Sequence, residues 1–362
     1  MSEFLSSLAG LAGEAVFDET ENFGLYNTDA VSRYNISEDH FTKSNRCRIL
    51  KTLLHGGCSY NCAYCRICKN KNMVSLKPKD LADYFLMQYQ KNLTDGIFLS
   101  SGIHGDADSV MEEIIETGML IRKGGFCGYM HLKILPGASR SDIKAASEIA
   151  TRISINIETT SKSRMSEISD EKDYLCDILK RQEWIASEAP GRHTTQLVVG
   201  AAGEDDREII GCMSGLYKKT KPARIYFSAF KAQKNTPLEN QQSTKKWRTN
   251  RLYQTDYLIR EYGYRPEEFY QVLSDTNFLL NFDPKILLAE NIGRTNAYTA
   301  GLKELMRIPG IGKKGAHKII NAREKNGAEY LCGLLHTGII RKKAAPYLTA
   351  KNGEYQSRIS DY

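Results

Sequence analysis

Residues 58–65 read Cys58-Ser-Tyr-Asn-Cys62-Ala-Tyr-Cys65, and this stretch decides how the rest of the chain is interpreted. It directly follows an apolar run at 49–54 and a Gly-Gly pair, which lets the backbone fold tightly into a loop. Three thiolates hold three irons of a four-iron cube and leave the fourth iron open to another ligand. Such an open position is typical of a catalytic metal site. We therefore expect a [4Fe–4S] cluster on Cys58, Cys62 and Cys65.

A zinc site is the alternative interpretation of the same cysteines. Zinc takes four ligands, and Cys68 or His55 would supply the fourth. The spacing and the position after the first expected strand favour the cluster, and the role of Cys68 stays open. The nine cysteines are odd in number and unevenly spaced, which does not suggest a disulfide framework.

Short apolar runs alternate with helix-like amphipathic stretches, such as 79–91 and 109–122, through the first two thirds of the chain. Successive β-α units predict a parallel sheet with helices outside, which forms an open or a closed barrel. Functional sites of such folds lie at the C-terminal ends of the strands. The strand-length runs are 49–54, 96–100, 128–135, 153–157, 196–199 and 223–230.

The CxxxCxxC spacing with Tyr64 before the last cysteine resembles the radical S-adenosylmethionine (SAM) superfamily. The resemblance implies an α/β fold, a partial TIM-like (β/α)6 barrel. It also implies that SAM binds the open iron and is cleaved, after one-electron reduction, to a 5′-deoxyadenosyl radical. An electron donor such as flavodoxin or ferredoxin is an implied partner.

The same resemblance implies SAM contacts at later strand ends. Ser-Ser-Gly at 100–102 matches the position of a glycine-rich segment that binds the SAM amino group. Asn156 and Glu158 look like a ribose-binding pair, and an amide and a carboxylate suit a diol. The alternative at each position is an ordinary turn, and for Lys133 a surface side chain. The expected SAM contacts are Tyr64, Ser100, Ser101, Gly102, Lys133, Asn156, Glu158 and Gly200.

Residues 305–320 read Leu-Met-Arg-Ile-Pro-Gly-Ile-Gly-Lys-Lys-Gly-Ala-His-Lys-Ile-Ile, which resembles a helix-hairpin-helix. Gly310 and Gly312 leave backbone N–H groups accessible to a phosphate at the start of a helix. Lys313, Lys314 and Lys318 add positive charge at the same place. Such a module contacts the DNA backbone without reading its sequence. A small helical packing or dimerisation module is the alternative.

From 45 to about 349 the chain resembles a family of radical SAM proteins associated with DNA modification or repair. We expect modification of a DNA base, favouring hypermodification or isomerisation of a substituted thymine. Repair by radical reversal, tRNA modification and a non-catalytic iron–sulfur DNA-binding protein are the alternatives. The target base has to be flipped or single-stranded. Candidates for its pocket are Tyr226, Ser228, Arg251, Tyr253 and Asp256. The alternative for the tyrosines is core packing, and for Arg251 and Asp256 it is helix surface charge.

The expected domains follow from these segments and from a polar stretch after residue 230. The net charge of +7 is weak support for a polyanionic partner. No apolar run reaches the ~20 residues of a membrane helix, and the first residues do not resemble a secretory signal, so a cytoplasmic location is expected. The domains are an extension at 1–44, the barrel at 45–235, a helical linker and substrate region at 236–282, the helix-hairpin-helix at 283–350 and a tail at 351–362.

Overall fold

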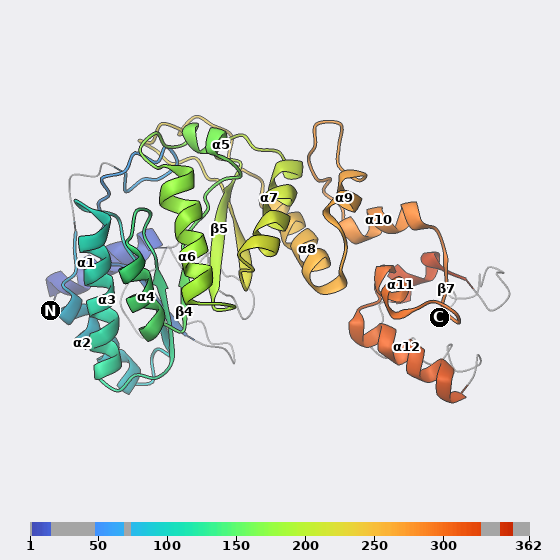
Figure 1. Cartoon of the computed structure of the whole chain (residues 1–362), viewed down its shortest axis with the longest axis horizontal. Coiled ribbons are helices and arrows are strands. Elements are labelled where there is room, and N and C mark those ends of the chain that lie inside the picture. The colour runs from blue at the N-terminus through green and yellow to red at the C-terminus, as the bar shows by residue number, and fades with distance from the viewer. Residues whose placement is uncertain (1, 16–47, 69–73, 327–340, 350–362) are drawn as a thin grey trace. The chain divides into compact units, whose positions relative to one another are not determined.

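A computed structural model describes residues 2–15, 48–68, 74–326 and 341–349 of the chain (Figure 1). The chain divides into two compact units. The first comprises residues 1–204 and 212–246, and the second comprises 205–211 and 247–362. Most of the expected N-terminal extension, from residue 16 on, and the whole expected tail lie outside the described residues.

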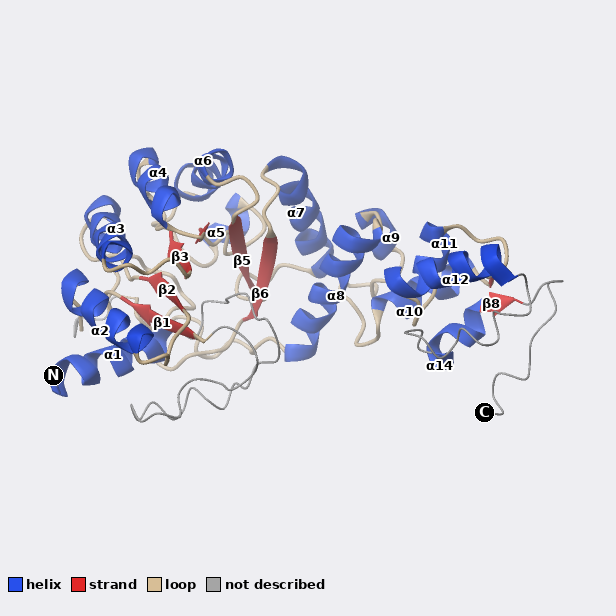
Figure 2. Ribbon diagram, turned by 90° about the horizontal axis from the view of Figure 1, so that it is seen from below, coloured by secondary structure: helices blue, strands red, loops and turns tan. Residues whose placement is uncertain are grey.

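The first unit is built on a six-stranded parallel sheet. Each strand pairs with the next one along the chain, and the sheet curls into an open half-barrel (Figure 2). The α/β class and the six strands expected from the apolar runs are therefore confirmed. The strands are β1 (Ile49–Leu53), β2 (Gly96–Ser100), β3 (Tyr129–Lys133), β4 (Arg152–Ser154), β5 (His193–Val199) and β6 (Arg224–Ala229).

Helices cover the outer side of the curled sheet (Figure 2). Side chains alternate between the two faces of a strand, so Ile97 and Leu99 join the core beneath the helices. Phe98 lies on the other face, where its ring meets the edge of His131 at 4.6 Å between centroids. The helices are α2 (Pro78–Gln90), α3 (Ala107–Lys123), α4 (Arg140–Ile149), α5 (Lys162–Ser166), the π-helical turn η3 (Tyr174–Leu179), α6 (Lys180–Glu188) and α7 (Asp206–Lys219).

The N-terminal helix α1 (Ser2–Glu14) is part of the first unit's core and not an appendage to it. It contacts β1, and its Leu8 and Leu11 are almost completely buried in the main hydrophobic cluster. Leu8 and Leu11 are three residues apart and therefore lie on one helical face, which explains how so short a helix docks. This docking is not predictable from the sequence, because Gly10 and Gly13 interrupt the apolar residues of the helix.

The second unit is mainly helical around a small core that includes Leu305, Ile308 and Ile311. A domain boundary was expected at residue 282, but elements before and after it are in contact within this unit. For example, the Tyr264 hydroxyl donates to the Arg307 carbonyl at 3.3 Å. In the described ranges no helix is long and apolar enough to cross a membrane. The elements are α8 (Lys246–Tyr262), α9 (Pro266–Tyr270), α10 (Pro284–Ile292), β7 (Thr295–Asn296), α11 (Leu302–Arg307), α12 (Lys313–Asn326), α14 (Arg341–Ala344), η5 (Ala345–Tyr347) and β8 (Leu348–Thr349).

Candidate functional site

A cavity of about 180 Å³ lies in the first unit, where the strands of the half-barrel end. Its wall is formed by the cysteine loop after β1 and by residues at the C-terminal ends of the other strands. This is the place where parallel α/β folds carry their sites. The sequence-predicted residues on its wall are Cys58, Cys62, Tyr64, Cys65, Ser100, Ser101, Gly102, Lys133, Asn156, Glu158 and Ser228.

The three cysteines of the loop share the cavity wall and interact electrostatically. Burial raises the pKa of Cys62, and burial together with the charge of Cys62 raises the pKa of Cys65 to about 12. Without a metal these two thiols are therefore protonated at neutral pH. A metal that binds them has to displace their protons, and its charge favours that exchange.

The surroundings of the other two zinc-ligand candidates argue against a single metal ion. The Cys68 thiol donates to the Tyr60 carbonyl at 2.9 Å, and His55 contacts Ser75 and Glu113 through its two ring nitrogens. Across the described residues, no three His, Cys, Asp or Glu side chains gather closely enough to hold one ion. Zinc needs converging ligands, whereas each cluster cysteine binds a different iron. Cys68 and His55 thus have other partners, and the remaining three cysteines equal the number of thiolates that hold a cube with one open iron.

Gly102 allows the end of β2 to lie against the cysteine loop. A Cβ at this position would stand 2.1 Å from the Gly57 carbonyl oxygen, so only glycine fits. The Gly102 N–H donates to the His55 carbonyl at 2.9 Å, and the Ser101 hydroxyl accepts from the His55 N–H at 3.2 Å. This segment therefore fixes the loop that carries the cysteines, in addition to lining the cavity.

Glu158 is a buried carboxylate held in a strained backbone conformation. Its φ of 65° lies in the left-handed region, which costs a non-glycine residue ~1–3 kcal/mol and is concentrated at functional sites. Hydrogen bonds to Gln196 and Val198 on β5 hold this backbone in place. Its Oε2 atom is buried and accepts no hydrogen bond, although the residue lines the cavity. A ligand hydroxyl would satisfy that oxygen.

Lys172 is a buried cation on the cavity wall that the sequence analysis missed. Its Nζ lies 3.2 Å from Glu158 Oε1, is hydrogen-bonded to Cys62, and sits over the Tyr60 ring at 5.7 Å. Burial by itself would lower the pKa of Lys172, but the charges of Cys62 and Glu158 raise it well above its usual range. No local motif marks this lysine, because only the fold brings it to the cysteines.

The cavity also contains a polar pair from neighbouring strand ends. Lys133 Nζ donates to Asn156 Oδ1 at 2.5 Å, so the two expected SAM contacts bind each other. Gly200, in contrast, is not among the residues of the wall. It has a φ of 89°, its N–H donates to Glu204, and its carbonyl accepts from Gln241 at 2.7 Å. In this structure Gly200 forms a turn beyond β5.

The five expected substrate-pocket residues belong to two different units of the chain. Ser228 lines the cavity, whereas Tyr226, two residues earlier on β6, is almost completely buried and is absent from the wall. Arg251, Tyr253 and Asp256 belong to α8 in the second unit. There Asp256 forms a buried ion pair with Arg260, with 2.9 Å between Oδ2 and Nη2.

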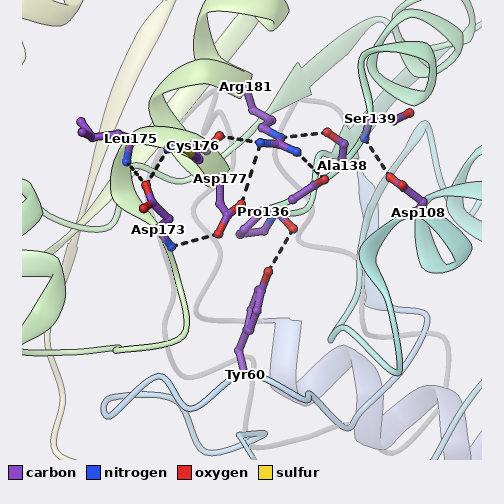
Figure 3. Close-up of polar contacts among 11 residues, drawn as sticks. Tyr60, Asp108, Pro136, Ala138, Ser139, Asp173, Leu175, Cys176, Asp177 and Arg181 are labelled. Atoms are coloured by element: carbon purple, nitrogen blue, oxygen red, sulfur yellow. Dashed lines mark hydrogen bonds and ion pairs between the residues drawn. The ribbon is translucent and has the colours of Figure 1, made fainter.

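Arg181 on α6 holds the loop after β3, whose Leu135 and Pro136 form one rim of the cavity. Figure 3 shows its polar contacts. Its guanidinium donates to the carbonyls of Gly137, Ala138 and Cys176 at 2.6, 2.8 and 2.5 Å. These bonds tie the loop after β3 to η3. The Tyr60 hydroxyl reaches from the cysteine loop to the Pro136 carbonyl at 3.4 Å, so the same rim is joined to the cysteine loop.

The expected hairpin in the second unit is a tight turn between α11 and α12. Gly310 has a φ of 80°, which favours glycine, and Ile308 and Ile311 anchor the turn in the core. Gly312 lies against Tyr262, whose hydroxyl would stand 3.2 Å from a Cβ at that position. The predicted phosphate-binding lysines, all exposed on the first turns of α12, are Lys313, Lys314 and Lys318.

Comparisons with solved structures show a likeness of fold and no finer relationship. Methylornithine synthase matches with a TM-score of 0.50 and 14% identity over 61% of this chain and 64% of that one. The FeFe-hydrogenase maturase HydG from Carboxydothermus hydrogenoformans gives 0.49 and 16%, over 58% and 51%. The cobalamin-dependent S-adenosylmethionine radical enzyme OxsB gives 0.39 and 12%, over 76% and 45%. The matches thus span roughly half to two thirds of those chains. No protein family and no curated protein matches the sequence.

Proposed function

We propose that the chain is a radical SAM enzyme whose [4Fe–4S] cluster is held by Cys58, Cys62 and Cys65. The single observation that carries the proposal is the cavity at the strand ends of the half-barrel. It collects all three cysteines and seven of the eight expected SAM contacts, which come from distant parts of the sequence. Bound together, the cluster and SAM would supply a 5′-deoxyadenosyl radical that removes a hydrogen atom from an unreactive C–H bond.

The side chains on the wall suit the binding and shielding of SAM. The Glu158 oxygen without a hydrogen-bond donor accepts from a ribose hydroxyl, and Lys133 or Lys172 offers positive charge for a carboxylate. Apolar residues such as Leu135 and Phe230 form other parts of the wall and exclude water from the reacting atoms. Gly102 and Arg181 hold the loops around these groups in position.

We propose DNA as the substrate and a base as the reacting group. The support is the turn between α11 and α12, which offers backbone N–H groups beside exposed lysines and matches the helix-hairpin-helix sequence pattern. A base in a duplex is inaccessible to a cavity, so it has to be flipped out or single-stranded. Modification of a substituted thymine, by hypermodification or isomerisation, is the favoured reaction.

The test is an anaerobic reconstitution of the full chain with iron and sulfide, followed by SAM and dithionite and mass spectrometry of 5′-deoxyadenosine. Cys62→Ala is the control because it removes one cluster ligand. We expect product from the wild type only, increased by DNA that contains hydroxymethyl- or aminoacyl-thymine. An increase with ultraviolet-damaged DNA instead would indicate repair, and one with tRNA would identify an RNA substrate. A bound cluster and DNA binding without SAM cleavage would overturn the proposed catalysis.

A further inference from the structure

Phe282 is the most exposed large apolar side chain in the described part of the chain, at 65%. It lies in the second unit, in the segment that joins α9 to α10, and its near neighbour Leu280 is also exposed. Single exposed apolar side chains are common and need no explanation by themselves. Phe282 is distinguished by its surroundings in the fold.

The residues on both sides of Phe282 are tied to the fold. Arg251 donates to Asn281 Oδ1 at 3.2 Å, and the Asp283 carboxylate accepts from the Lys285 N–H at 3.0 Å, which caps α10. The aromatic ring is therefore presented from a fixed backbone. A side chain that is held in place before binding loses little freedom when it makes a contact.

The same segment lies beside the turn between α11 and α12. Lys285, about one helical turn after Phe282, donates from Nζ to the Ile311 carbonyl at 2.7 Å, in the middle of that turn. Asp283 is also within 3.7 Å of Lys343 Nζ on α14. The backbone that carries Phe282 is thus connected to this turn through the side chain of Lys285, three residues further along the chain.

We infer that Phe282 is a stacking platform for an unpaired DNA base whose backbone is bound at the neighbouring turn. The inference rests on the proposed binding of nucleic acid by that turn. Exposed Lys313 and Lys314 give this end of the unit the charge that a polyanion complements, which an apolar protein partner would not require. Aromatic rings stack on any base because every base has a π-face. A flipped or single-stranded base needs such a surface after it leaves its neighbours.

The first measurement is the binding of the full chain to a labelled oligothymidylate of about 12 nucleotides, as a function of salt. Phe282→Ala should weaken binding ~5- to 150-fold without changing the salt dependence. Phe282→Tyr should restore binding and Phe282→Leu should not, because leucine keeps the apolar surface but has no π-face. Ile292→Ala is the matched control: it removes another exposed apolar side chain, 48% exposed, from the opposite end of α10, and should leave binding unchanged.

A double-mutant cycle then tests whether the partner is a base. An abasic site is moved along the oligonucleotide. At one or two positions it should lower the affinity of the wild type but not the affinity of the Phe282→Ala protein. Equal losses for both proteins at every position would overturn the inference, as would full binding by Phe282→Leu. If the wild type binds no DNA, the proposed substrate fails first; if it binds and Phe282→Ala binds equally well, only the stacking platform fails.

Discussion

Replacing Gly102 by alanine tests how the cysteine loop is held. The new Cβ would stand 2.1 Å from the Gly57 carbonyl oxygen and 3.2 Å from the His55 carbonyl oxygen. These neighbours are backbone atoms, so no side chain can rotate away. The loop has to retreat by about 1 Å to restore an ordinary contact, and overpacking of this kind costs ~1–3 kcal/mol. For a domain of this size the melting temperature should fall by ~2–12 °C.

The assay is thermal unfolding of the metal-free protein, followed by the iron content after reconstitution. Iron content should also fall, because Cys58 is the next residue after Gly57 and moves with it. Gly215→Ala is the matched control: its Cβ meets nothing within 4 Å on α7, so the same change should stabilise the protein by ~0.5–1 kcal/mol. A Gly102→Ala protein with unchanged melting temperature and iron content would refute the reasoning.

Three further predictions concern charge and hydrogen bonding. Cys65, whose pKa is about 12, should react with iodoacetamide at pH 8 on the order of a thousandfold more slowly than an ordinary thiol in the metal-free protein, with exposed Cys127 as the reference in mass spectrometry. Lys285 has a pKa of about 8, lowered by burial from 10.5, so the unfolded chain binds more protons between these values. The free energy of unfolding of the second unit should therefore increase as pH rises from 8 to 10.5. Lys285→Met should abolish that increase in urea titrations. Arg181→Gln should lower the free energy of unfolding by about 2–4 kcal/mol, whereas Arg140→Gln, which removes only a surface ion pair with Glu188, should change it by less than ~1 kcal/mol.

The sequence predicted the sheet well because its strands carry their signal locally. β2 is a run of five buried residues bounded by polar segments, and every other strand overlaps an apolar run found in the same way. The cysteine loop and the strand-end residues could be assigned to one cavity for a related reason. In a parallel sheet with strands in chain order, successive strand ends meet at one edge.

Features that depend on distant contacts could not be predicted. Lys172 lies in a polar segment with no motif, and it reaches Cys62 and Glu158 only because the chain returns after β4. The docking of α1 on β1 depends on a surface that forms only when the first unit folds, and no local sequence pattern indicates it. Gly102 illustrates a mixed outcome: the residue was identified, but its close approach to the cysteine loop is visible only in three dimensions.

The strand order has a consequence for synthesis on the ribosome. Because each strand pairs with the one before it, the half-barrel can grow from β1 towards β6 while later segments are still being translated. The cysteine loop emerges early, but Glu158 and Lys172, which interact with Cys62, emerge only after β4. The nascent chain therefore carries accessible thiols through much of its elongation. Iron delivered in that interval would meet an open loop, whereas iron delivered after release would have to enter a finished cavity.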